Sequence, residues 1–132
     1  MLPVAGLVAL AIAAQSAGMG VGDMRGQRRV LIMNAATATD PLLIAQRRAL
    51  AGWRKGAEDR DVTVVEAIGD RVTGTRDAAT ALRRTYRLPA DRFAVVLIGK
   101  DGTVAFRATD PVLPEQLQGT IDAMPMRRAG GR

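Results

Sequence analysis

The strongest local signal in the chain is the sequence FAVVLIGKDGTVAFR at residues 93–107. Its first part, 93–98, is apolar and rich in β-branched residues, which predicts a buried strand. Asp101 and Gly102 follow, and this pair suits the positive φ angles of a two-residue hairpin turn. The run 103–107 then predicts a partner strand, so we expect an antiparallel hairpin here.

The residues before this hairpin predict two parallel strands joined by a helix. The run Val30-Leu31-Ile32-Met33 is continuously apolar, which is typical of a strand buried on both faces. Asp40-Pro41 predicts a helix start, with Asp40 as the N-cap and proline in the first turn. Apolar residues at helical spacing extend this helix to about Gly56, and 62–68 is again β-rich. Strands joined in this way lie parallel, with a right-handed crossover.

Two further helices complete the predicted order of elements. One covers residues 76–87, and the last carries Leu117 and Ile121 on one face and ends at Pro125. The loop between the second strand and the first of these helices contains no predicted strand. The order β-α-β-α-β-β-α therefore predicts an α/β fold with a mixed four-stranded sheet flanked by helices.

The first 22 residues carry no charged side chain. Their apolar run, 4–14, has the length of a signal-peptide core and is shorter than the roughly 20 residues of a spanning helix. We therefore expect a signal peptide or apolar leader at 1–22, a domain over 23–128 and a mobile basic tail at 129–132. The domain would be exported, to a bacterial periplasm or outside the cell, and no integral membrane span is expected. No Lys or Arg precedes the apolar run, so an uncleaved leader that tethers the domain to a membrane and a buried N-terminal helix stay open.

Two residue types are missing from this chain of 132 residues. It contains no Cys, which excludes disulfides, thiolate nucleophiles and cysteine-ligated metals. It contains no His, which excludes a Ser-His-Asp triad and imidazole ligation. Thiol–disulfide oxidoreductase activity is therefore excluded, and no metal or cofactor is expected.

The chain is basic, with a net charge of +6 and a pI of about 11.2. Such a balance attracts nucleic acids, anionic membranes or acidic partners, although a GC-rich coding bias that favours Arg and Ala has the same effect on charge. Aromatic residues make up only 3% of the chain, which leaves few side chains for stacking on bases. A protein or a small anion is therefore the expected partner, rather than a nucleic acid.

Four groups of residues point to a family. They are Gln46 in the first predicted helix, Asp59-Arg60-Asp61 before the second strand, 97–102 in the hairpin, and Ile121-Asp122-Ala123-Met124-Pro125-Met126-Arg127-Arg128. The hairpin resembles that of thioredoxin-like proteins, and the full set resembles an uncharacterised bacterial family, domain of unknown function 4174. This resemblance spans about residues 27–128. It implies a thioredoxin-like fold and frequent export, and it implies no known activity.

The chain departs from redox-active thioredoxins at both of their redox elements. Their two cysteines lie where the first strand meets the first helix, and this chain has Ala36-Thr37-Ala38-Thr39-Asp40 there. A cis-proline precedes their third strand, and counting back from the hairpin places Ala94 near that position. The resemblance therefore implies the scaffold without its redox chemistry.

Two candidate sites contain acidic side chains and hydroxyls. Thr37 and Thr39 lie at the start of the first helix, where backbone N–H groups can hold an anion, although Asp40 would repel it and capping is the alternative. Asp59, Asp61 and Asp70 could serve acid–base chemistry or bind a hard cation. Arginines are interleaved with these carboxylates, so ordinary ion pairing is the favoured interpretation.

A third candidate combines Asp122 with Arg127 and Arg128 near the C-terminus. The two arginines could present a fork to a carboxylate or phosphate. Alternatively, Asp122 pairs with a following arginine and holds the C-terminal segment on the domain.

Three function classes remain. We favour an exported, non-redox accessory module that binds a protein or a small anion. The first alternative is an enzyme that uses Asp and Arg, with Asp59, Asp61 or Arg128 in its site. The second alternative is a basic binder of nucleic acid or of a membrane surface, which requires arginines clustered on one face.

Overall fold

The computed structural model describes residues 18–128 and residue 130. Most of the predicted leader, residues 1–17, and most of the predicted tail therefore lie outside the described residues. Within the described part, no helix has the length and apolar composition needed to cross a bilayer. The elements, in chain order, are η1 (Val21–Met24), β1 (Arg29–Ala35), α2 (Pro41–Leu50), α3 (Arg54–Asp59), β2 (Val62–Ile68), β3 (Arg71–Thr73), α4 (Ala79–Tyr86), β4 (Ala94–Ile98), β5 (Val104–Ala108), α5 (Pro114–Asp122) and α6 (Pro125–Arg128).

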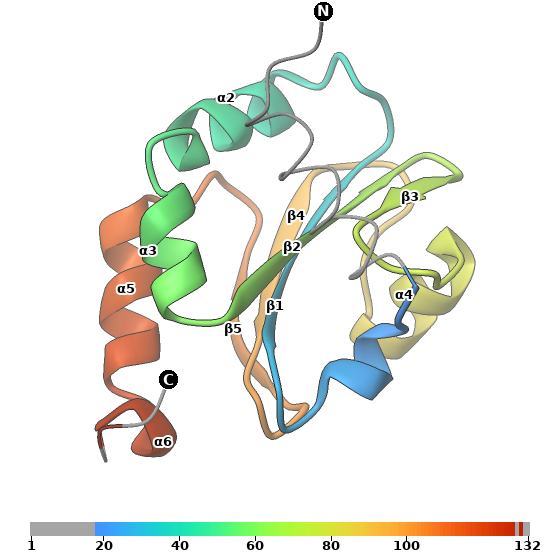
Figure 1. The fold of residues 1–132 in the computed structure, drawn as a ribbon. Helices are drawn as coiled ribbons and strands as arrows, with labels where there is room; N and C mark the ends of the chain where they lie inside the picture. Colours follow the sequence, from blue (N-terminus) through green and yellow to red (C-terminus); the bar gives the residue numbers. More distant parts are fainter. Residues whose placement is uncertain (1–17, 129, 131–132) are drawn as a thin grey trace, which may run out of the picture.

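The strands form one mixed sheet in the order β3-β2-β1-β4-β5. β1 and β2 are parallel, as the predicted βαβ unit requires, and the other neighbours are antiparallel. Figure 1 shows the sheet between two layers, with α2, α3 and α5 on one face and η1 and α4 on the other. This arrangement confirms the predicted α/β class.

The sheet has five strands, so the predicted count of four is wrong. The additional strand is β3, which pairs with β2 across a turn at Gly69 and Asp70. Gly69 has a φ of 58°, a conformation that glycine adopts without steric cost and that lets the chain reverse tightly. β3 has only three residues and lies at the edge of the sheet. None of its residues is buried, so it lacks the apolar pattern from which the other strands were predicted.

The predicted hairpin is present, but its loop has three residues instead of two. Gly99 donates its N–H to Thr103 O at 2.9 Å, and Gly102 donates to Gly99 O at 3.0 Å. Of the Asp-Gly pair, only Gly102 has a positive φ, at 85°. A single left-handed glycine suits a three-residue loop with a bulge, whereas a two-residue turn of the predicted type needs two such residues.

Helix boundaries also differ from those predicted. The first helix is interrupted after Leu50, and a second segment, α3, begins after Trp53. The Trp53 indole lies directly against Gly56, where any Cβ would overlap it, so the bulky ring and the glycine form one packing unit. At the other end of the chain, α5 ends at Asp122, before the predicted end at Pro125, and Pro125 is the first residue of the short helix α6.

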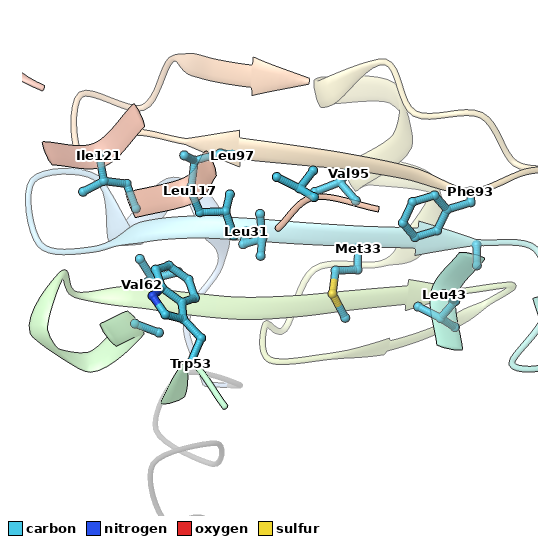
Figure 2. Packing of buried hydrophobic residues seen from close by; sticks show 13 residues of the cluster. Leu31, Met33, Leu43, Trp53, Val62, Phe93, Val95, Leu97, Leu117 and Ile121 are labelled. Atoms are coloured by element: carbon cyan, nitrogen blue, oxygen red, sulfur yellow. The ribbon is translucent and has the colours of Figure 1, made fainter. Parts of the chain in front are cut away.

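β1 separates two apolar clusters because its side chains alternate between the faces of the sheet. Leu31 and Met33 pack under α2, α3 and α5, as Figure 2 shows. Val30 and Ile32 pack under η1 and α4. Gln46 ties α2 to the segment before α5, because its buried amide donates to Val112 O and accepts from Val112 N, at 2.9 and 2.7 Å.

The folded domain includes residues that precede position 23. Met19 O accepts hydrogen bonds from Arg76 N and from the Thr75 hydroxyl. Val21 N donates to the Asp77 carboxylate at 2.7 Å, and the Val21 side chain is buried. These contacts connect the start of the described chain to the loop before α4.

Candidate functional site

The loop between β1 and α2 holds the first predicted site. The Thr37 and Thr39 hydroxyls lie 3.3 Å apart and are hydrogen-bonded to each other. The Asp40 carboxylate accepts from Leu42 N at 2.8 Å, which confirms Asp40 as the N-cap of α2. The polar side chains of the loop are therefore engaged locally, and the carboxylate occupies the helix terminus where an anion would have to bind.

A buried polar group beneath this loop was missed in the sequence. Asn34, within β1, is fully buried, and its amide donates to Pro89 O at 2.6 Å and to Arg92 O at 3.0 Å. Arg83 from α4 donates to the Asn34 carbonyl oxygen at 2.9 Å. Asn34 directly follows the apolar run 30–33 within β1, and this break in the pattern was the signal available. The group holds the segment before β4 against β1.

The other redox position also contributes only to packing. Ala94 is the first residue of β4 and is buried, with its side chain in the cluster under η1 and α4. No cis peptide bond occurs among the described residues. This position therefore holds a small buried side chain.

The third predicted site lies at the end of α5. Arg60 donates two hydrogen bonds to the two Asp122 oxygens, at 3.1 and 3.2 Å. Arg127 donates to Asp122 at 3.3 Å and to Asp59 O at 3.2 Å. These donors lower the pKa of Asp122, the Arg60 hydrogen bonds having the largest effect. Asp122 thus holds α6 on the domain, while Arg128 lies in α6 with its side chain outside the described part.

A buried arginine also contacts the residues around Asp122. Arg29, at the start of β1, is fully buried and donates to Arg60 O at 2.6 Å and to the Met124 sulfur at 3.3 Å. Burial lowers the pKa of Arg29, and the negative charge of Asp61 opposes that effect. Arg29 lies outside the predicted strand, because that prediction rested on the continuous apolar run 30–33, whereas β1 begins at Arg29.

The acidic residues of the second predicted site are dispersed. Lys100 donates to the Asp61 carboxylate at 2.9 Å, and the Lys100 side chain is almost fully buried. Asp59 contributes its backbone carbonyl to Arg127, and Asp70 lies in the β2–β3 turn. Within the residues that the structure describes, no three acidic side chains are grouped so that they could hold a metal ion. Ion pairing is therefore what Asp61 does in this fold.

The first and third predicted sites lie at opposite ends of β1. Thr37 and Thr39 follow its carboxyl end, whereas Asp122 and Arg127 surround its amino end. Seven residues of strand separate the two ends by about 20 Å. These residues cannot form one site.

A cavity of about 320 Å³ lies on the other face of the sheet, close to the amino end of β1. It is bounded by η1, the end of α4 and the β4–β5 hairpin, and neither Asp59 nor Asp61 lines it. This site was not predicted, since residues from distant segments, such as Arg25 and Tyr86, line it. The lining residues are Val21, Gly22, Arg25, Arg28, Val30, Tyr86, Ile98, Gly99, Asp101, Gly102 and Thr103.

Solved structures with a similar fold are peroxiredoxins. Prx1a of Plasmodium yoelii has a TM-score of 0.58 at 17% sequence identity, covering 85% of this chain and 82% of that chain. The reduced 2-Cys peroxiredoxin of Plasmodium vivax has a TM-score of 0.59 at 14% identity, covering 77% and 80%. At these identities the likeness establishes a thioredoxin-like fold, which the resemblance predicted.

Among curated proteins, the chain is similar to the Sushi repeat-containing protein SRPX of Homo sapiens. The two are 32% identical over 111 residues, which cover 77% of this chain and 24% of SRPX. The SRPX proteins of rat and mouse match to the same extent. The chain therefore spans about a quarter of the length of these relatives.

The family resemblance predicted from the sequence is confirmed over almost all of the described domain. A family model matches residues 21–130, which include the buried Gln46, the Arg60–Asp122 pair and the β4–β5 hairpin. The chain therefore belongs to the family described as Domain of unknown function (DUF4174), with a thioredoxin-like fold and no cysteine.

Proposed function

We propose that this chain is an exported binding module that uses a thioredoxin-like scaffold without thiol chemistry. One observation carries the proposal. The loop 36–40, in the place of the redox cysteines of thioredoxins, contains no sulfur. Its polar side chains cap α2, through Asp40, and form a hydrogen bond between Thr37 and Thr39. What the scaffold does must then depend on shape and on fixed charge.

A reductase assay tests the absence of redox chemistry. With dithiothreitol and insulin, we expect the rate of insulin reduction to equal that of dithiothreitol alone. The double variant Thr37→Cys/Asp40→Cys supplies a matched positive control, because it places a Cys-x-x-Cys pair at the start of α2. A rate above the chemical background in the unmodified chain would refute the proposal.

Export is supported by the uncharged first 22 residues and their apolar run. Met19 and Val21 make hydrogen bonds within the domain, so we place any cleavage before Met19. A fusion of residues 1–18 to alkaline phosphatase, which is active only after export, should give activity in bacteria. The matched variant Leu7→Arg/Leu10→Arg should abolish it, since charges in the apolar run prevent insertion. Activity unaffected by this change would contradict export through this segment.

An enzyme built on Asp59 and Asp61 is not favoured. Asp61 is paired with Lys100, and the side chains lining the cavity come from other positions. A nucleic-acid binder is not favoured either, because Arg29, Arg60 and Arg127 are directed to carbonyls, to Asp122 and to Met124 within the domain. A binding site for a small anion remains, and the cavity is its best location.

A further inference from the structure

The cavity between η1, α4 and the β4–β5 hairpin has an apolar floor. Val30 of β1 and Ile98 of β4 form it, and they are opposite each other in the antiparallel ladder. Val21 and Tyr86 form part of the walls. Burial raises the pKa of Tyr86, so its phenol is neutral at pH 7. A volume of about 320 Å³ lies at the lower end of the range found for small-molecule sites, which is enough for a compact organic ligand.

Arg28 gives the cavity a positioned cation. Its Nε donates to the Thr63 hydroxyl at 2.5 Å and its Nη2 to Val62 O at 3.2 Å. Nη1 makes no hydrogen bond within the described chain and keeps its donors for another group. The two bonds hold the half-buried guanidinium in place, so a bound anion would not have to restrict its rotation.

Arg25 gives the cavity a second cation, held against the hairpin. Its side chain lies so close to Gly102 that a Cβ there would come within 3.2 Å of the Arg25 Cδ. Asp101 accepts from the backbone N–H and the hydroxyl of Thr103, which lower its pKa, and the charge of Arg25 adds to this effect. Asp101 is therefore ionised, and two arginines with one carboxylate leave a net charge of +1 around the cavity.

We propose that this cavity binds a small organic monoanion with one carboxylate and an apolar body. The carboxylate lies against Arg28 and Arg25, and the body lies on Val30 and Ile98. This assignment rests on the proposed function as a non-redox binding module. A single net positive charge matches one carboxylate, while the Asp101 carboxylate disfavours a phosphate dianion. An amine is disfavoured because both arginines repel it.

Titration of the full chain with benzoate, followed by the amide resonances of a ¹⁵N-labelled sample at low ionic strength, tests the assignment. We expect saturable shifts at Val21, Gly99 and Gly102, with a Kd on the order of 1 mM. Benzamide has the same shape without the charge and should bind at least about tenfold more weakly. Benzylamine should cause no shifts at these positions. Equal affinities for benzoate and benzamide, or no saturable shift with benzoate, would overturn the proposal.

Variants locate the anion. Arg25→Gln removes an exposed cation that makes no hydrogen bond within the described residues, so the fold should persist while benzoate affinity falls about threefold to tenfold. Arg28→Gln should lower it by about tenfold or more. Arg48→Gln, on the exposed side of α2, is the matched control and should leave the affinity unchanged. Unchanged affinity in both Arg25→Gln and Arg28→Gln would overturn the assignment. The insulin reduction assay does not depend on the cavity. If benzoate fails to bind while insulin reduction stays at the background rate, the ligand class is refuted and the non-redox scaffold is not.

Discussion

The two ends of β1 carry different kinds of polar contact. At its carboxyl end, the polar side chains of the exposed loop 36–40 form hydrogen bonds with residues two positions away, such as Thr37 with Thr39. At its amino end, Arg60 reaches Asp122 across 62 residues, and Arg29 reaches Met124 across 95. At the carboxyl end, the buried Asn34 makes comparable long-range contacts, with Pro89 O and with Arg83.

This difference shows which positions hold the fold together. The side chains of loop 36–40 contribute the N-cap of α2 and one hydrogen bond between Thr37 and Thr39. The amino end connects β1, α3 and α5 through buried or partly buried charges. Residues of three sequence groups that carry the family resemblance meet there, in the pairs Arg60–Asp122 and Lys100–Asp61. Part of the resemblance therefore lies in ion pairs that connect separate elements of the fold.

The largest effect is expected for Arg29→Met. The change leaves Arg60 O without its donor and removes the positive charge facing Asp61, both in a buried setting. We expect the free energy of unfolding to fall by about 3 kcal/mol, measured by urea denaturation. Arg48→Met, an exposed arginine on α2, should change it by less than about 0.5 kcal/mol. Equal effects of the two changes would show that the amino end is not a special anchor.

Asn34→Ala should produce the next largest effect. It leaves Pro89 O, Arg92 O and the Arg83 guanidinium without their amide partner beneath the loop. The expected loss is about 2 kcal/mol in the same urea assay, because buried polar groups become unsatisfied. Thr37→Ala, only three residues away but exposed, should cost less than about 0.5 kcal/mol. A small effect of Asn34→Ala would mean that the carboxyl end lacks a tertiary anchor altogether.

Asp40→Ala tests the local character of the loop. It removes the side-chain cap on Leu42 N, and we expect a loss of about 1 kcal/mol by thermal or urea unfolding. Asp40→Asn keeps an oxygen acceptor at the N-cap and should restore most of this stability. If Asn and Ala at this position were equally destabilising, the carboxylate would be acting through its charge instead.

Asp122→Asn should have the smallest effect, since the side chain is 46% exposed and solvent screens its charge. We expect a loss of about 0.5 kcal/mol at pH 7 that shrinks with added salt. The pKa of Asp122 is lowered in the folded state, so its contribution is complete above the unfolded value of about 4 and is lost as the pH falls through the folded one. Stability curves of the variant and the unmodified chain should converge below about pH 4. A gap that widens toward acid would contradict the role of Arg60 and Arg127 as its partners.

Most strands and helices could be predicted from local pattern, because each has its own apolar period or cap. The strand 62–68 is observed with the predicted bounds, and Asp40 is the predicted N-cap. β3 could not be predicted, since its three residues pair at an edge without burying a face. Of the candidate sites, the pairing of Asp122 with Arg127 was anticipated as docking, whereas Arg60 as its second partner was not.

The composition alone settled that this chain performs no thiol or imidazole chemistry, because no arrangement in space can supply a missing sulfur or ring nitrogen. Apolar periodicity was sufficient for the four longer strands and for the βαβ unit, since these elements bury their faces by rules that act over a few residues. It did not reveal the edge strand β3 or the break between α2 and α3. The tertiary structure decided which charged side chains are buried. It also decided that one cavity is lined by Arg25, Arg28 and Tyr86. These groups come from separate segments, and only the packing of η1 and α4 on the sheet brings them together.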